Sequence, residues 1–131
     1  MKSLSVYILL SALLTGLQAA GTPDLAQRDS DSDGKPDREI VVKGTEFSFS
    51  PDKVEIKPGE TVQIRFVNAG RVAHNLNLVK LGKKTETIQA GKKDSFIFSI
   101  DEPGKYQFVC KVPGHKQAGM KGTLVVQENE P

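Results

Sequence analysis

The residues able to bind a soft metal ion are few in this chain and fall into one pattern. Apart from the initiator methionine, the sequence contains one cysteine, two histidines and one methionine, which are Cys110, His74, His115 and Met120. Three of them form a Cys-x4-His-x4-Met run, and His74 lies far upstream. A thiolate, two imidazoles and a thioether are the donor set of a mononuclear type 1, or blue, copper site. We therefore expect one Cu(I)/Cu(II) ion per chain as the cofactor.

Each donor also has an ordinary structural interpretation. A histidine on a half-buried strand is more often structural than a ligand, and a methionine between small residues can fill a gap in a core. A lone cysteine can be an inert buried thiol, although in an exported protein an odd cysteine needs an explanation. A metal thiolate provides one, because the bound sulfur is protected from oxidation and pairing. The coincidence of all four donors favours the metal site.

The elements that must position these donors are strands. From Arg38 onward, short runs alternate apolar and polar residues and are separated by glycine and proline turns about every ten residues. This pattern predicts an all-β domain over 38–128, folded as an antiparallel Greek-key β-sandwich of about eight strands. No segment has a helical period. The expected strands are 39–43, 47–50, 54–56, 61–68, 74–81, 85–88, 95–100, 106–110 and 123–126.

A sandwich of this kind explains how distant donors could meet. Its loops gather at two ends, so one end can hold His74 beside the loop that follows Cys110. Pro113-Gly114 predicts a tight turn that brings His115 back toward the cysteine, and Ala118-Gly119 predicts a second bend that returns Met120. We expect the four side chains to converge, with His115 nearest the surface.

Three segments carry a resemblance to a known family. They are Val-Ala-His-Asn-Leu over 72–76, Cys-Lys-Val-Pro-Gly-His over 110–115 and His-Lys-Gln-Ala-Gly-Met-Lys-Gly over 115–122. The first segment resembles the first-ligand motif of the cupredoxins. The second resembles the azurin-type ligand loop, and the third resembles the plastocyanin-type end of that loop. The complete Cys-x4-His-x4-Met spacing is similar to that of rusticyanin and auracyanin.

The cupredoxin resemblance implies specific roles. His74, Cys110 and His115 would be the trigonal copper ligands, with Met120 as the axial one. Asn75 would brace the two ligand segments by hydrogen bonds, where the alternative is an ordinary turn residue. The fold implied is an eight-stranded Greek-key sandwich.

The donor set and the resemblance predict a small exported electron carrier rather than an enzyme. Four protein ligands leave no coordination position open for a substrate, which catalytic metal sites require. The alternative is copper trafficking, storage or resistance, because the same ligands could hand over the metal. Such proteins gain from Met-rich or open sites, and this sequence offers only Met120.

The expected partners are redox proteins, and the chain is expected to be a monomer. Val112, Pro113, Ala118 and Gly119 could form an apolar contact surface around His115. No acidic residue occurs from 103 to 127, a stretch that includes Lys105, Lys111, Lys116 and Lys121. These lysines predict a basic rim that favours an acidic docking face, unless they are ordinary solubilising charges.

The N-terminal region has the layout of a secretory signal over 1–20, with Lys2, an apolar run and then small residues. Cleavage near Ala20 predicts a periplasmic or extracellular protein with no membrane span; an uncleaved anchor is the alternative. The sequence has 18 basic and 16 acidic residues, and without Lys2 the net charge falls from +2 to near +1. This balance does not indicate nucleic-acid binding.

Residues 21–37 predict a polar, Asp-rich linker. Within it, Asp29, Asp31, Asp33 and Asp37 match the first half of a calcium-binding loop. The twelfth position, which should be acidic, is Ile40. A solvated acidic linker is therefore favoured over a calcium site.

Overall fold

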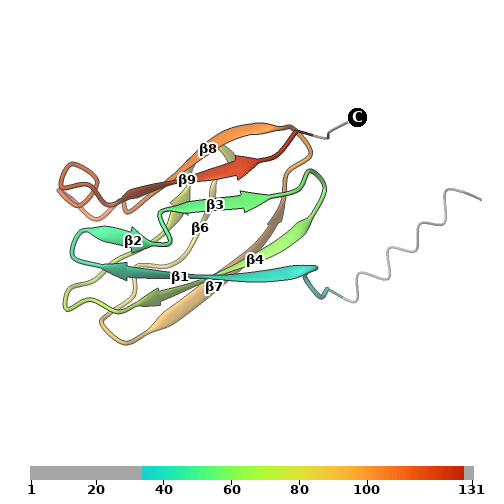
Figure 1. The fold of residues 1–131 in the computed structure, drawn as a ribbon. Helices are drawn as coiled ribbons and strands as arrows, with labels where there is room; N and C mark the ends of the chain where they lie inside the picture. The colour runs from blue at the N-terminus through green and yellow to red at the C-terminus, as the bar shows by residue number, and fades with distance from the viewer. Residues whose placement is uncertain (1–33, 129–131) are drawn as a thin grey trace, which may run out of the picture. The chain divides into compact units, whose positions relative to one another are not determined.

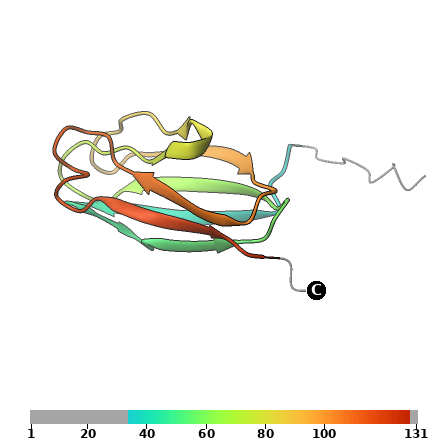
Figure 2. The same ribbon diagram turned by 90° about the horizontal axis from the view of Figure 1, so that it is seen from above.

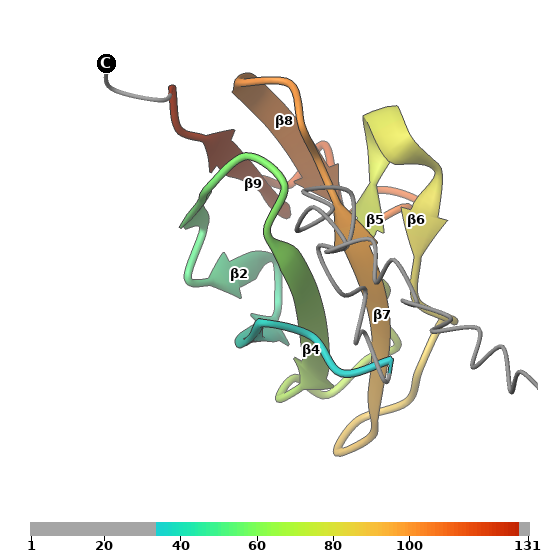
Figure 3. The ribbon, with the colours of Figure 1, turned by 90° about the vertical axis from the view of Figure 1, so that its right-hand side faces the viewer.

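The computed structural model describes residues 34–128, which form two β-sheets packed face to face (Figure 1). The first sheet has the order β2-β1-β4-β7 and the second β3-β9-β8-β5-β6. Figure 2 shows the sandwich from above, where one sheet lies over the other, and Figure 3 looks along the strands. The first sheet comprises β1 (Arg38–Thr45), β2 (Ser48–Ser50), β4 (Thr61–Asn68) and β7 (Lys93–Ser99). The second comprises β3 (Lys53–Ile56), β5 (Asn77–Leu78), β6 (Lys83–Lys84), β8 (Gly104–Val109) and β9 (Lys121–Val126).

The predicted all-β sandwich is confirmed, but its strands are not all antiparallel. β1 pairs in parallel with β4, and β3 pairs in parallel with β9. Between β1 and β4 the chain forms β2, crosses to the second sheet as β3 and then returns. Parallel neighbours need such a crossover connection, whereas antiparallel neighbours can be joined by a hairpin. The two sheets are therefore mixed.

The segment after His74 is much less regular than the expected strand over 74–81. Only Asn77–Leu78 pairs as β5, and the chain then makes a single 3-10 turn, η1 (Val79–Leu81). Thr85 accounts for part of the difference, because its hydroxyl accepts the hydrogen bond of the Leu76 N–H at 3.0 Å. Side-chain hydrogen bonds of this kind compete with strand ladders. Of the weak strand expected over 85–88, Ile88 forms a bridge with His74.

The core lies between the sheets and supports the end of the sandwich where His74 and Cys110 are found. Phe49 of β2 packs edge-on against Phe66 of β4 and Phe108 of β8, with ring centroids 5.9 and 5.3 Å apart. Gly44 of β1 lies directly against this cluster, since a Cβ there would be 2.7 Å from a carbon of the Phe66 ring. It would also be 3.0 Å from the terminal methyl carbon of Met120. A side chain at position 44 would therefore disturb the packing beneath the predicted site.

Several N-terminal predictions fall outside the described residues. These are the signal peptide over 1–20, most of the 21–37 linker, and Asp29, Asp31 and Asp33 of the calcium motif, which all stay predictions. Asp37 is described, and its carboxylate accepts a hydrogen bond from the Thr61 N–H at 2.8 Å. Among residues 34–128, no helix has the length and apolar character needed to cross a membrane.

Candidate metal centre

His74 is held in a fully buried position by backbone hydrogen bonds. Its N–H donates to the Ile88 carbonyl at 3.1 Å, and its own carbonyl accepts from the Ile88 N–H at 2.9 Å. The segment leading to it is fixed by Asn68, whose side-chain amide donates to the carbonyls of Val72 and Ile88. The Asn68 oxygen accepts from the Gly70 N–H. These hydrogen bonds satisfy the buried polar groups and keep the His74 imidazole in place.

The loop from Cys110 to Met120 is closed by its own backbone. The Cys110 N–H donates to the Met120 carbonyl at 3.1 Å, and the Met120 N–H donates to the His115 carbonyl at 3.0 Å. Gly114 and Gly119 have φ values of +84° and +110°, a region that residues with a side chain rarely adopt. The glycines thus allow the two bends that the sequence predicted, and the bends bring both ends of the loop together.

Three of the predicted donors meet in space. The Nδ1 atoms of His74 and His115 are 3.1 Å apart, and Cys110 Sγ lies 3.5 Å from His115 Nδ1. All three donor atoms lie within 4.8 Å of one another. Metal–nitrogen and metal–sulfur bonds of about 2.0 and 2.3 Å in a trigonal arrangement would separate the donors by roughly 3.5 Å. The three side chains therefore fit a single small metal ion, and a thiolate with two imidazoles suits copper.

Met120, the fourth predicted donor, lies at the end of the loop that carries Cys110 and His115. It is fully buried, and its backbone is hydrogen-bonded to both Cys110 and His115. Its side chain reaches the inner surface of β1 at Gly44. Its role as the axial ligand stays a prediction.

Asn75 connects the segments that carry His74 and Cys110. Its side-chain oxygen accepts the Lys111 N–H at 2.7 Å and the Asn77 side-chain amide at 2.8 Å. Its own amide donates to the Thr87 hydroxyl at 2.8 Å. The hydrogen bond from Lys111 is the kind of brace that the resemblance implied, because it ties the residue after the cysteine to the residue after the histidine.

Glu46, between β1 and β2, was not predicted as part of the site. Its Oε1 lies 3.1 Å from His74 Nε2 and accepts hydrogen bonds from the N–H groups of Arg71 and Val72 at 2.6 and 3.1 Å. These two backbone bonds, with a smaller contribution from His74, lower the pKa of Glu46 to about 2. The sequence held no signal for this contact, because Glu46 looks like an ordinary polar residue beside a turn and lies 28 residues from His74.

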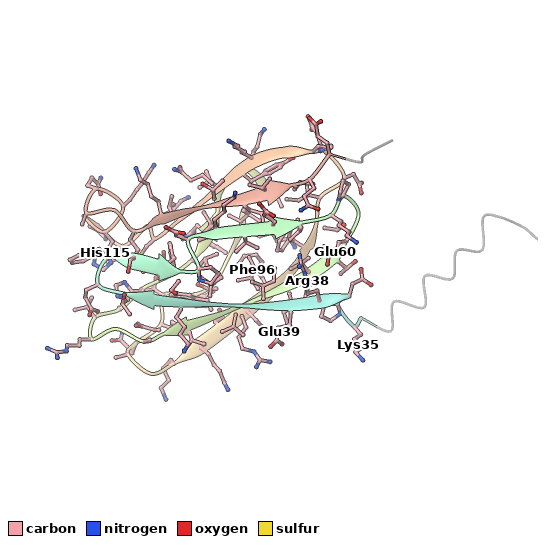
Figure 4. The ribbon with its side chains drawn as sticks, viewed as in Figure 1. Lys35, Arg38, Glu39, Glu60, Phe96 and His115 are labelled. Carbon is pink, nitrogen blue, oxygen red and sulfur yellow. The ribbon has the colours of Figure 1, made fainter. Side chains whose placement is uncertain are left out.

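His115 is the partly exposed member of the group. The ring of Phe47 packs edge-on against its imidazole with centroids 4.9 Å apart, and 40% of the Phe47 residue remains exposed. Burial and the neighbouring His74 lower the pKa of His115. Pro113 and Ala118 are exposed nearby in the loop, and Figure 4 shows His115 at the loop-rich end of the sandwich. Phe47 therefore adds an apolar residue to the surface that the sequence predicted.

A family model described as a cupredoxin-like domain matches residues 7–126. The chain belongs to the cupredoxin family. The predicted family is thus confirmed, and the cupredoxin fold accounts for the sandwich and for the end at which the donors meet.

Several known proteins are similar to this chain over about two thirds of its length. Plastocyanin of Nostoc punctiforme is 36% identical over 93 residues, covering 62% of this chain and 66% of that protein. The copper-resistant cuproprotein CopI of Rubrivivax gelatinosus is 26% identical, covering 66% of this chain and 64% of that protein. The chain thus spans about two thirds of the length of these two relatives. The solved structure of auracyanin B has a TM-score of 0.63 and 25% identity, covering 72% of this chain and 91% of that one.

Proposed function

We propose that this cupredoxin is a blue copper protein that carries single electrons between redox partners. The observation that carries the proposal is the convergence of His74, Cys110 and His115 donor atoms within 4.8 Å, beside the buried Met120. These four residues would hold the ion, which when bound would supply the Cu(I)/Cu(II) couple. The similarity to plastocyanin and to auracyanin B supports the same function.

The chain's contribution is a rigid donor set. The loop closes on its own backbone hydrogen bonds, and Asn75 fixes it to the segment that carries His74. Donors that are fixed before the metal binds rearrange little when the charge of the metal changes, which favours rapid electron exchange. Four protein donors would also fill the coordination sphere, whereas catalytic sites keep a position open. We therefore propose a carrier and not an enzyme.

Copper handling is the second candidate, and the similarity to CopI favours it. In electron transfer the copper ion stays bound and only an electron leaves, whereas in copper handling the ion itself leaves the site. A carrier should pass through repeated cycles of ascorbate reduction and ferricyanide oxidation with its blue band fully restored, while a Cu(I) chelator removes copper only slowly. Rapid loss of copper to the chelator, together with slow electron exchange, would contradict the carrier and support copper delivery.

The proposed site for a redox partner combines apolar and basic residues next to Cys110. A groove of about 330 Å³ is lined by apolar residues, among them Val79 and Val112, and by Lys111 and Lys116. A neighbouring groove includes Lys83, Lys84 and again Lys111. Lys105 does not belong to this region, because it lies near the start of β8 and Cys110 follows the other end of that strand. We therefore propose a basic rim that leaves out Lys105 and includes the lysines of β6.

Neutralising Lys111 and Lys116 together, as Lys111→Gln and Lys116→Gln, is expected to slow association with an acidic c-type cytochrome about tenfold at low ionic strength. Stopped-flow kinetics across a salt series would measure it, and the difference should disappear near 1 M salt, where charges are screened within about 3 Å. Lys53→Gln with Lys105→Gln is the matched control, because both residues line a groove on the β9 side near Asp52. Equal rates for the two double variants, or rates insensitive to salt, would contradict the basic docking surface.

We also propose that the carrier acts outside the cytoplasm, in the periplasm or beyond, after removal of residues 1–20. The N-terminal segment supports this proposal by its composition. Mass spectrometry of the protein isolated from an expressing cell would identify its first residue.

A further inference from the structure

We propose that Glu46 is a positioning residue of the copper centre, which orients His74 through its Nε2 atom and lowers the reduction potential of the bound ion. The inference rests on the proposed function, because it concerns the metal that His74 would bind. It adds a charged group that comes from the turn between β1 and β2, outside both ligand segments.

A metal bound at the proposed centre would determine which nitrogen of His74 carries the proton. Nδ1 faces His115 Nδ1 at 3.1 Å, on the side where the donor atoms meet. A metal-binding nitrogen must present a lone pair, so the proton of the neutral imidazole is on Nε2. This N–H donates to Glu46 Oε1 at 3.1 Å. A carboxylate that accepts the second N–H of a ligand histidine sets the ring orientation and makes the ring a stronger donor.

The Glu46 carboxylate is held in place by further hydrogen bonds, whereas an incidental surface contact would have none. The same oxygen that faces His74 accepts the N–H groups of Arg71 and Val72. Glu46 directly follows β1, whose position is set by pairing with both β2 and β4. The carboxylate thus joins the end of β1 to the segment that leads into His74.

The close packing of Gly70 against Glu46 and His74 is a second, independent observation that supports this contact. A Cβ at position 70 would overlap Glu46 Oε1 and would lie 2.9 Å from His74 Nε2. A residue with a side chain would therefore displace the carboxylate, the imidazole or both. Glycine at this position leaves the space that the hydrogen bond between Glu46 and His74 occupies.

The expected electronic effect has a definite sign. A negatively charged carboxylate that accepts the N–H of a ligand imidazole favours the more highly charged Cu(II) over Cu(I). The Glu46 side chain is 32% exposed, so solvent screens part of this effect. Removing the charge should therefore favour Cu(I) and raise the reduction potential.

Glu46→Gln is the direct test, because the amide oxygen can still accept the same hydrogen bonds while the charge is lost. We expect the reduction equilibrium to shift about tenfold toward Cu(I), which corresponds to about 59 mV in a one-electron couple. Glu102→Gln is the matched control, since Glu102 precedes β8 at the end of the sandwich opposite Cys110. Redox titration followed by the visible band measures both variants, and equal potentials for Glu46→Gln, Glu102→Gln and the unmodified protein would overturn the inference.

Gly70→Ala separates the position of the carboxylate from its charge. This variant keeps every charged residue, yet it should raise the potential in the same direction as Glu46→Gln. NMR of the Cu(I) form should show a slowly exchanging His74 Nε2 proton that is lost in Gly70→Ala. A purely structural role for Glu46 would lower the unfolding free energy of these variants without moving either the potential or this proton signal, and that result would overturn the inference.

Failure of the proposed function gives a different outcome. If the unmodified protein shows no blue band with copper, the carrier proposal fails, and the Nε2 proton can still be observed in the zinc-loaded protein. If the unmodified protein is blue, Glu46→Gln and Gly70→Ala match it in potential, and Gly70→Ala keeps the His74 proton signal, only the role of Glu46 fails.

Discussion

Replacing Cys110 with serine is expected to remove the intense visible band of the copper-loaded protein completely. The band of a blue site arises from charge transfer between the thiolate and Cu(II), and Cys110 is the only cysteine in the chain. Copper affinity should fall at least about 100-fold, which is the upper end of the loss caused by removing a group that merely supports a ligand. Visible spectroscopy and competition titration with a chelator measure the two effects.

The fold should survive this substitution. Cys110 is fully buried beside His115, so a serine hydroxyl there should cost about 1–3 kcal/mol of unfolding free energy in the metal-free protein. Cys110→Ala serves as a second variant without the buried hydroxyl. A blue band that persists in either variant would show that the colour does not come from the thiolate of Cys110.

Asn75→Ala is expected to lower the unfolding free energy of the metal-free protein by about 3 kcal/mol and to weaken copper binding about tenfold. The substitution removes three hydrogen bonds, of which the one from the Lys111 N–H has no replacement. The Asn77 amide keeps the Val109 carbonyl at 3.4 Å, and the exposed Thr87 can turn to solvent. The orphaned N–H should cost about 1–3 kcal/mol, and each of the other two lost hydrogen bonds about 0.5–1.5 kcal/mol. Urea unfolding of the metal-free and copper-loaded protein measures the effect.

Asn68→Ala is the matched control for this prediction. Asn68 is buried at least as deeply as Asn75 and also makes three side-chain hydrogen bonds, but all three partners lie within residues 70–88. Both variants should lose stability, whereas only Asn75→Ala should accelerate hydrogen exchange of the Lys111 amide. Equal exchange of that amide in the two variants would contradict a link between the ligand segments.

The donors and most strands could be predicted because their signals are local. Alternation along 61–68 matches β4 residue for residue, and the glycine and proline turns mark where strands end. Cys110, His115 and Met120 are close in sequence, so their loop could be recognised from its spacing. His74 required one further step, the expectation that a sandwich gathers its loops at an end.

The other features of the fold and of the site depend on contacts between residues far apart in the sequence. The parallel pairing of β1 with β4 leaves no trace in the alternation of either strand. Glu46 reaches His74 only because β1 ends beside the segment that follows β4. Lys105 and Lys111 were predicted to share one basic rim, although the two lysines lie toward opposite ends of β8. A run of lysines in the sequence does not show how far apart their side chains lie in the fold.

The directions of β1 and β9 determine how the domain could be oriented on an electrode surface. Arg38 begins β1 and Val126 ends β9, and both strands run so that these residues lie at the end of the sandwich opposite His115 (Figures 1 and 4). An engineered thiol linker joined after Val126 would immobilise the domain on a gold electrode with the imidazole facing the solution. Attachment through the loop beside His115 would instead face the metal site toward the gold, so the point of attachment alone selects which side exchanges electrons.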